Sequence, residues 1–289
     1  MSVDTAVAPA RLTPPPAYRG TLARQLRSET LMVFRRKRNI LMLLVLGAVP
    51  VLIGTAIKLA APRPGEGPPL ISQVAGNGLF LAFAALTICL PVFLPLAVAV
   101  VAGDAVAGEA SAGTLRYLLT VPVSRTRLFA IKCFGVLVYI AAAILLVVSV
   151  GAVVGAVYFG IHGVTMLGGE TLSNTAGFER TVGIALFVFI DLLGLASMAM
   201  FFSTLTEVPV GAMAATVGFA ITFAVLESVP QLGGFRGLLL THDWLGFASL
   251  LRRFVDMHQL VHSTYIPLAY TAIFGTAAWA RLLTADVTS

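Results

Sequence analysis

The sequence predicts an all-α integral membrane protein with six transmembrane helices. Hydrophobic residues make up 58% of its 289 residues, charged residues only 11%, and the mean hydropathy is +0.95. A soluble globular domain of this length does not normally have such a composition. Six spans leave little chain for a water-soluble domain, so a single transmembrane domain is expected over residues 39–289.

Six apolar stretches are long enough, or nearly so, for the roughly 20 residues that a spanning helix needs. They are Ile40–Ile57, Leu79–Ala102, Cys133–Phe159, Val182–Phe202, Val208–Leu226 and Tyr265–Leu283. The second stretch contains Pro91 and Pro95, which are expected to kink it. Only a short turn separates the fourth stretch from the fifth, so these two helices should pack as antiparallel neighbours.

The chain ahead of the first span divides into two parts. Residues 1–20 contain three consecutive prolines and are typical of a disordered tail. Residues 21–38 are predicted to form an amphipathic helix at the membrane interface, because Leu22, Leu26 and Val33 cluster on one face of a helical wheel. The other face carries Arg24, Arg27, Arg35 and Arg38.

Basic residues are concentrated on one side of the predicted spans. Eight of the 19 precede the first span: Arg11, Arg19, Arg24, Arg27, Arg35, Arg36, Lys37 and Arg38. By the positive-inside rule, both termini of this multi-pass protein face the cytosol, and the cell (plasma or inner) membrane is its expected location. The run 35–38 is interpreted as a topology determinant that contacts anionic membrane lipids. The net charge of +6 therefore does not indicate nucleic acid as a partner.

A polar interruption between the second and third spans is 108–132, GEASAGTLRYLLTVPVSRTRLFAIK. On a helical wheel, Leu115, Leu118 and Leu119 fall on one side and Glu109 on the opposite side. This pattern predicts a short amphipathic helix over 108–120, whose leucines contact either a partner protein or the bilayer surface.

The end of this helix and the start of the next are also marked in the sequence. Val121 precedes Pro122 and is biased toward extended backbone, which ends a helix. Ser124 is an expected N-cap for the segment that leads into the third span.

The loop resembles the cytoplasmic loop of ABC transporter permeases of the type-2 class. In that family the pattern reads E, three residues, GTL, two residues, LL, two residues, PVSR, and a basic residue before the next span. Here the pattern is carried by Glu109, Gly113, Thr114, Leu115, Leu118, Leu119, Pro122, Val123, Ser124, Arg125 and Lys132. The resemblance implies an exporter subunit for drugs, lipids or polysaccharides that couples through this loop to a separate ATPase, which binds ATP and Mg. The residues expected to couple are Glu109, Gly113, Thr114, Leu115, Leu118, Leu119, Pro122 and Arg125.

The same resemblance implies an assembly of two permeases with two ATPase subunits. The two permeases would be a homodimer, or a heterodimer with a similar permease. Residues 21–38 look like the interfacial helix of this class, and residues 229–262 look like its re-entrant helical pair between the last two spans. The residues alone predict an amphipathic helix there, with Trp244, Phe247 and Leu251 on one face. A helix lying flat on the membrane is the alternative.

Asp191 lies near the middle of the fourth span. Inserting an ionised carboxylate there costs roughly 2.5 to 3.5 kcal/mol, so its side chain should face the bundle interior, a water-filled path or a partner. Three interpretations remain open: contact with a cationic substrate, a proton relay, and a structural hydrogen bond to Ser or Thr on a neighbouring helix.

Enzyme motifs are weak or absent in the sequence. No G-x-x-x-x-G-K-[ST] loop is present, so ATP hydrolysis is expected in the partner, and the chain itself is not expected to be an enzyme or to hold a cofactor. No residue is singled out as catalytic or as a metal ligand, since His258 and His262 lack the Glu of an H-E-x-x-H site. The alternatives to an ABC permease are a proton-coupled secondary transporter using Asp191 and a membrane-embedded enzyme.

Overall fold

The computed structural model describes residues 22–60, 80–113, 124–160, 164–165, 171–172, 174–251 and 257–284. Its elements, in chain order, are α1 (Leu22–Arg35), α2 (Lys37–Ala60), α4 (Phe80–Cys89), α5 (Phe93–Asp104), α6 (Ala107–Ser111), α8 (Arg125–Phe159), β1 (Val164–Thr165), β2 (Thr171–Leu172), α9 (Asn174–Leu205), α10 (Pro209–Glu227), the 3-10 helices η1 (Pro230–Leu238) and η2 (Gly246–Leu251), and α11 (Met257–Thr284). The strands form one short antiparallel pair, with Val164 opposite Leu172.

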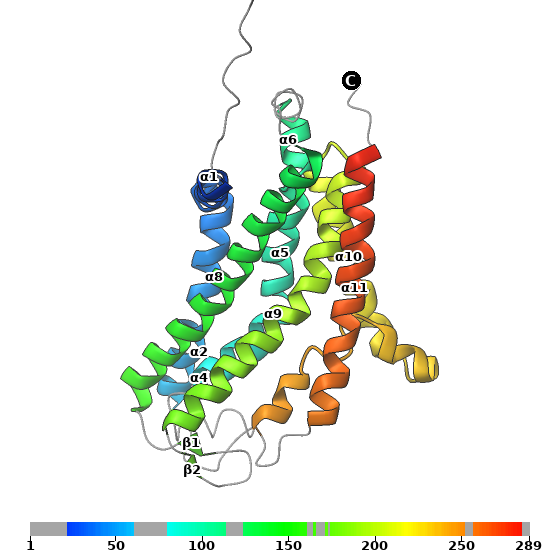
Figure 1. Ribbon diagram of the computed structural model, residues 1–289. Helices are drawn as coiled ribbons and strands as arrows, with labels where there is room; N and C mark the ends of the chain where they lie inside the picture. Colours follow the sequence, from blue (N-terminus) through cyan, green and yellow to red (C-terminus); the bar gives the residue numbers. More distant parts are fainter. Residues whose placement is uncertain are drawn as a thin grey trace, which may run out of the picture.

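Five helices are long and apolar enough to cross a membrane: α2, α8, α10 and most of α9 and α11. The pair α4 and α5 also passes this test when taken together, with a bend of 58° between its halves. The described chain is therefore an essentially all-helical, membrane-embedded protein. Its longest helix, α8, has 35 residues, and α1 runs across one end of the bundle, where Figure 1 shows it end-on.

The bend between α4 and α5 confirms the kink predicted for the second apolar stretch. Backbone hydrogen bonding along α4 ends with Leu90 N–H to Leu86 C=O at 2.8 Å, and resumes with Leu96 N–H to Val92 C=O at 3.0 Å. Pro91 has no N–H and its ring crowds the preceding turn, so the chain turns there instead of continuing straight.

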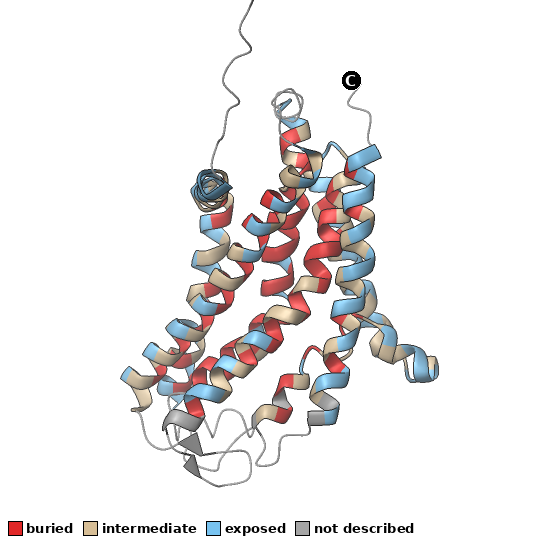
Figure 2. Cartoon of the chain, in the orientation of Figure 1, coloured by how far each residue is buried: buried red, intermediate tan, exposed pale blue. Residues whose placement is uncertain are grey.

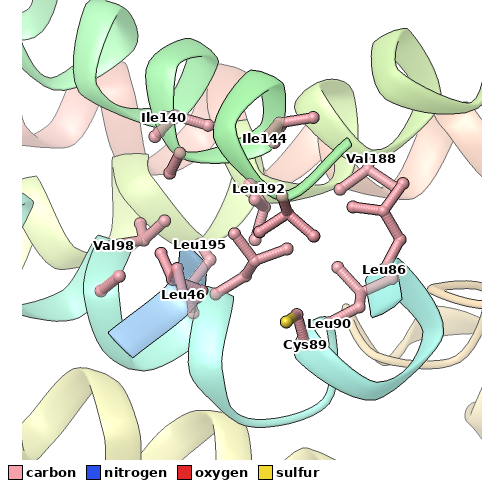
Figure 3. Packing of buried hydrophobic residues seen from close by; sticks show 14 of the residues in the cluster. Leu46, Leu86, Cys89, Leu90, Val98, Ile140, Ile144, Val188, Leu192 and Leu195 are labelled. Atoms are coloured by element: carbon pink, nitrogen blue, oxygen red, sulfur yellow. The ribbon is translucent and has the colours of Figure 1, made fainter. Parts of the chain in front are cut away.

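The core lies where α2, α4, α5, α8 and α9 meet. Figure 3 shows leucine, isoleucine and valine side chains of these helices pointing toward one another, among them Leu46, Leu90, Ile144 and Leu192. Buried residues gather on α4, α5, α9 and the inner side of α8, whereas α10 and α11 are largely exposed (Figure 2). Exposed leucines, valines and phenylalanines on outer helices are expected in a protein surrounded by lipid.

Close helix packing depends on glycine where α8 meets α4. A Cβ atom added at Gly151 would lie 2.7 Å from Ala82 Cα, which is too close for any side chain. Small residues of this kind let two helix backbones approach closely inside a membrane.

Two predicted helices differ in the structure. The prediction of one continuous helix over 108–120 is wrong. The helix α6 ends at Ser111, and Gly113 has φ of 67°, a left-handed conformation that ends helices. The amphipathic helix expected around Trp244 is replaced by turns and the 3-10 helix η2. Its predicted apolar face is still buried at Trp244 and Phe247, because Trp244 packs in the bundle from a turn and Phe247 from η2.

The predicted packing of the fourth and fifth spans is confirmed. A three-residue connection, 206–208, joins α9 to α10, and the two helices contact each other. The most extensive contact of α9, however, is with α11. Of the five spanning helices, α9 has the largest buried share, so it is the central helix of the described part of the bundle.

Candidate functional site

A cluster of six charged side chains lies at the end of the bundle that carries α1 and α6 (Figure 1). Its members are Glu29 on α1, Arg36 at the bend before α2, Arg38 on α2, Asp104 at the end of α5, Glu109 on α6 and Lys132 on α8. We call these six residues the ion cluster. Its three carboxylates equal its three cations in number, so the ion cluster as a whole carries no net charge.

Lys132 is the centre of the ion cluster. Its Nζ donates to both carboxylate oxygens of Glu29, at 3.0 Å each, and to Oε1 of Glu109 at 2.9 Å. These contacts use all three donors of the ammonium group. The three residues are only 5% to 9% exposed, so each charge depends on the others for compensation.

The second half of the cluster surrounds Asp104. Both Arg36 and Arg38 form salt bridges to its carboxylate, that of Arg38 at 2.9 Å. Arg36 also lies 3.8 Å from Glu109 Oε1, which joins the two halves. The cluster thereby connects α1, α2, α5, α6 and α8 through side-chain charges.

The surrounding backbone is shaped to hold the cluster. Ser203 of α9 accepts hydrogen bonds from the backbone N–H groups of Val106 and Ala107, at 3.0 and 2.9 Å, and so caps the break between α5 and α6. A Cβ at Gly135 would lie 2.9 Å from Glu29 Cγ. The Glu29 side chain therefore passes over Gly135, which has no side chain, to reach Lys132.

A small cavity of about 10 Å³ adjoins these charges. It is lined in part by Glu29, Arg36, Asn39 and Lys132. Asn39 donates to the Val33 carbonyl at 2.8 Å, and its Oδ1 has no partner within the described residues. The volume is near the lower limit for one water molecule, which is the ligand that such a polar lining accommodates.

The structure places three of the predicted coupling residues. Glu109 is buried in the ion cluster and Gly113 forms the turn after α6. Arg125 donates to the carbonyls of Leu282 and Leu283 at 3.2 and 2.8 Å, at the end of α11. The other predicted coupling residues, Thr114, Leu115, Leu118, Leu119 and Pro122, lie outside the described residues.

The N-cap predicted at Ser124 is confirmed, since its hydroxyl accepts from Arg127 N–H at 3.3 Å. The first turn of α8 therefore has two attachments: its own cap and the Arg125 contact with α11. Such cation contacts to the last carbonyls of a helix are favourable because the C-terminal end carries partial negative charge.

Sequence reasoning missed most of the ion cluster. One signal was present: Glu29 lies three residues after Leu26 and four before Val33, within the apolar stripe of the predicted interfacial helix. A carboxylate in that position needs a buried partner. The partner, Lys132, is 103 residues away, and no local pattern connects the two.

Asp191 is fully buried in α9, with a relative exposure of 0%. Neither of its carboxylate oxygens has a hydrogen-bond partner within the described residues. The structural hydrogen bond from Ser or Thr, one of the three interpretations of this residue, is therefore not formed in the described part of the chain.

Together, the apolar helices and the buried charges define a polytopic membrane protein with a charged cluster at one end of its bundle. Residues 70–229 match the family described as protein of unknown function, DUF2705, and this match covers more than half of the chain. The chain therefore belongs to the DUF2705 family. Among curated proteins, none matches it. The matched residues include Asp104, Glu109, Lys132 and Asp191 and exclude α1 and α11.

Proposed function

We propose that this chain is the transmembrane permease subunit of an ATP-driven ABC exporter, and that it couples to a separate ATPase through the loop that begins with α6. The observation that carries the proposal is the contact of Glu109 with Lys132, which in turn binds Glu29. Through this contact, the residue that opens the permease-like loop pattern is tied to both α1 and α8. A push on the loop is thereby passed to the interfacial helix and to a spanning helix.

The proposed architecture has six spans, with α4 and α5 counted as one bent span. In Figure 1, α1, α6 and the last turn of α11 lie at the same end of the bundle, so both ends of the described chain fall on one side of the proposed membrane. The basic residues ahead of α2 assign that side to the cytosol. Two such permeases and two ATPase subunits form the proposed complex in the cell membrane. The ATPase subunits bind ATP and Mg, and the turns and 3-10 helices within 229–262 act as a re-entrant lid over a substrate path that includes Asp191.

The topology can be tested by cysteine labelling. In a variant lacking Cys89 and Cys133, a cysteine at Ser173 is expected to react with an impermeant thiol reagent from outside the cell. A cysteine at Ser111, which is exposed at the end of α6, is expected to react only after permeabilisation. The reverse labelling pattern would contradict the exporter orientation.

The coupling role is tested by changing Leu118 and Leu119 together to Ser. Burying each leucine against a partner contributes roughly 1.5 to 3 kcal/mol, so the double variant is expected to lose the ATPase in detergent. Substrate-stimulated ATP hydrolysis should be abolished while membrane insertion and dimerisation persist. The measurement is co-purification of the tagged ATPase, followed by an ATPase assay.

A matched control is Leu22→Ser with Leu31→Ser, which changes two leucines of α1 that are 52% and 51% exposed. This control is expected to retain the ATPase. If Leu118→Ser/Leu119→Ser co-purifies with its ATPase at full stoichiometry and transports normally, the proposed docking surface is wrong.

A proton-coupled secondary transporter is the second candidate, because Asp191 is a buried carboxylate without a hydrogen-bond partner in the described residues. The two candidates differ in their energy source. Transport driven by ATP is inhibited by vanadate, whereas transport driven by a proton gradient is inhibited by an uncoupler.

A further inference from the structure

The segment from Leu239 to Gly246, here called the crossing segment, passes over α9 at the level of Asp191. A Cβ at Gly194 would lie 2.7 Å from Leu240 Cδ1, and one at Gly246 would lie 3.2 Å from Phe187 Cζ. Phe187 and Gly194 are four residues before and three residues after Asp191, so all three share one face of α9. Residues 241–245 therefore bridge the helix where Asp191 lies.

The polar groups at this crossing are buried without partners. Thr241 Oγ1 and Trp244 Nε1 of the crossing segment, like both oxygens of Asp191, make no hydrogen bond within the described residues. Thr241 is 7% exposed and Trp244 is 6% exposed. Each orphaned group costs free energy, so orphaned groups on both sides of one crossing make it a candidate ligand site.

The charge of the crossing favours a cation as that ligand. The crossing segment itself carries a second carboxylate, Asp243. Within the described residues, no salt bridge joins either carboxylate to a basic side chain. The neighbouring His242 faces Glu227, with 3.3 Å between Nδ1 and Oε1, which adds a further carboxylate near the segment.

Aromatic side chains provide the remaining surface of the crossing. Phe187, Trp244 and Phe247 are each no more than 6% exposed. Aromatic faces attract ammonium-type cations, most strongly when water is excluded. A pair of carboxylates beside buried aromatic rings is suited to an organic cation with apolar substituents, whereas a small hydrated metal ion prefers a shell of oxygen ligands.

We propose that Asp191, together with Thr241 and Trp244, forms the binding site of an organic cation that enters when the crossing segment moves away from α9. The chain that leads into the crossing segment is kinked in η1 at Gly233, which has φ of 50° and no atom within 4 Å of its Cβ position. This inference rests on the proposed function in one respect: if the chain is a permease, the cation is the substrate that it exports.

The test measures binding to the purified chain alone, without ATPase, in lipid nanodiscs. Radiolabelled tetraphenylphosphonium is the probe, and neutral triphenylphosphine oxide is the uncharged comparison. Wild-type protein is expected to bind the cation saturably, and Asp191→Asn is expected to weaken this binding at least tenfold without changing retention of the neutral compound. Asp191→Glu, which keeps the charge, should retain most of the affinity.

Two further variants separate a direct contact from a general effect. Glu179→Gln removes an exposed carboxylate from the same helix and should leave cation binding unchanged. Trp244→Leu removes the aromatic face and the Nε1 donor, and is expected to weaken binding severalfold. Thermal unfolding and gel filtration establish that each variant is folded before its affinity is compared.

Equal cation affinity of Asp191→Asn and wild type would overturn the proposal, as would the absence of saturable binding of both tetraphenylphosphonium and tetraethylammonium to wild type. Because no ATPase is present, loss of cation binding leaves the test at Leu118 and Leu119 unaffected. Conversely, if the chain does not bind an ATPase, the binding measurement still shows whether Asp191 contributes to cation affinity.

Discussion

Lys132→Met is expected to destabilise the protein by about 3 to 5 kcal/mol, which is typical of removing one partner of a buried ion pair. The substitution removes the three hydrogen bonds of Nζ and leaves the carboxylates of Glu29 and Glu109 facing each other in a buried site. The measurement is the apparent melting temperature of the detergent-solubilised protein.

Two comparisons make this result specific to the ion cluster. Lys37→Met removes an exposed lysine at the start of α2, and its effect is expected to stay within about 0.5 kcal/mol. Adding Glu109→Gln to Lys132→Met returns the cluster to zero net charge and should recover part of the lost stability. A melting temperature of Lys132→Met equal to that of wild type would show that the cluster does not hold this end of the bundle together.

Gly151→Ala is expected to cost about 1 to 3 kcal/mol, because the added methyl group overlaps Ala82 Cα and forces α4 away from α8. Melting of the same detergent-solubilised protein reports this loss. Gly218→Ala is the matched control: it also lies within a helix, α10, but has no atom within 4 Å of the new Cβ. Removing this glycine should be neutral, or stabilising by about 0.4 to 1 kcal/mol. Equal effects of the two substitutions would contradict the close packing of α4 and α8.

Features with a local cause could be predicted from the sequence. Pro91 bends the second apolar stretch because proline lacks an N–H, and Ser124 caps α8 because its hydroxyl reaches the N–H three residues ahead. Helix ends were less accurate. The apolar stretch beginning at Cys133 belongs to a helix that starts at Arg125, since hydropathy does not detect the polar turns at the ends of a long helix.

The candidate sites depend on contacts that no local pattern encodes. Lys132 was found only as the last residue of a loop pattern, whereas its role in the structure comes from Glu29, on a helix far away in the sequence. Asp191 could be identified as an isolated carboxylate in an apolar stretch, but its position under the crossing segment depends on how that segment folds back onto α9. The predicted helix failed there because the backbone forms turns between Leu240 and Gly246 that bury the same side chains.

The length of α8 has a mechanical consequence. Thirty-five residues at 1.5 Å each make a rod of about 52 Å, against about 30 Å for the hydrocarbon layer. No proline interrupts it, whereas the neighbouring α4 and α5 are separated by a bend of 58°. A single continuous helix thus joins the end of the bundle that holds the ion cluster to the opposite end, beside a pair of helices that covers the same depth in two pieces.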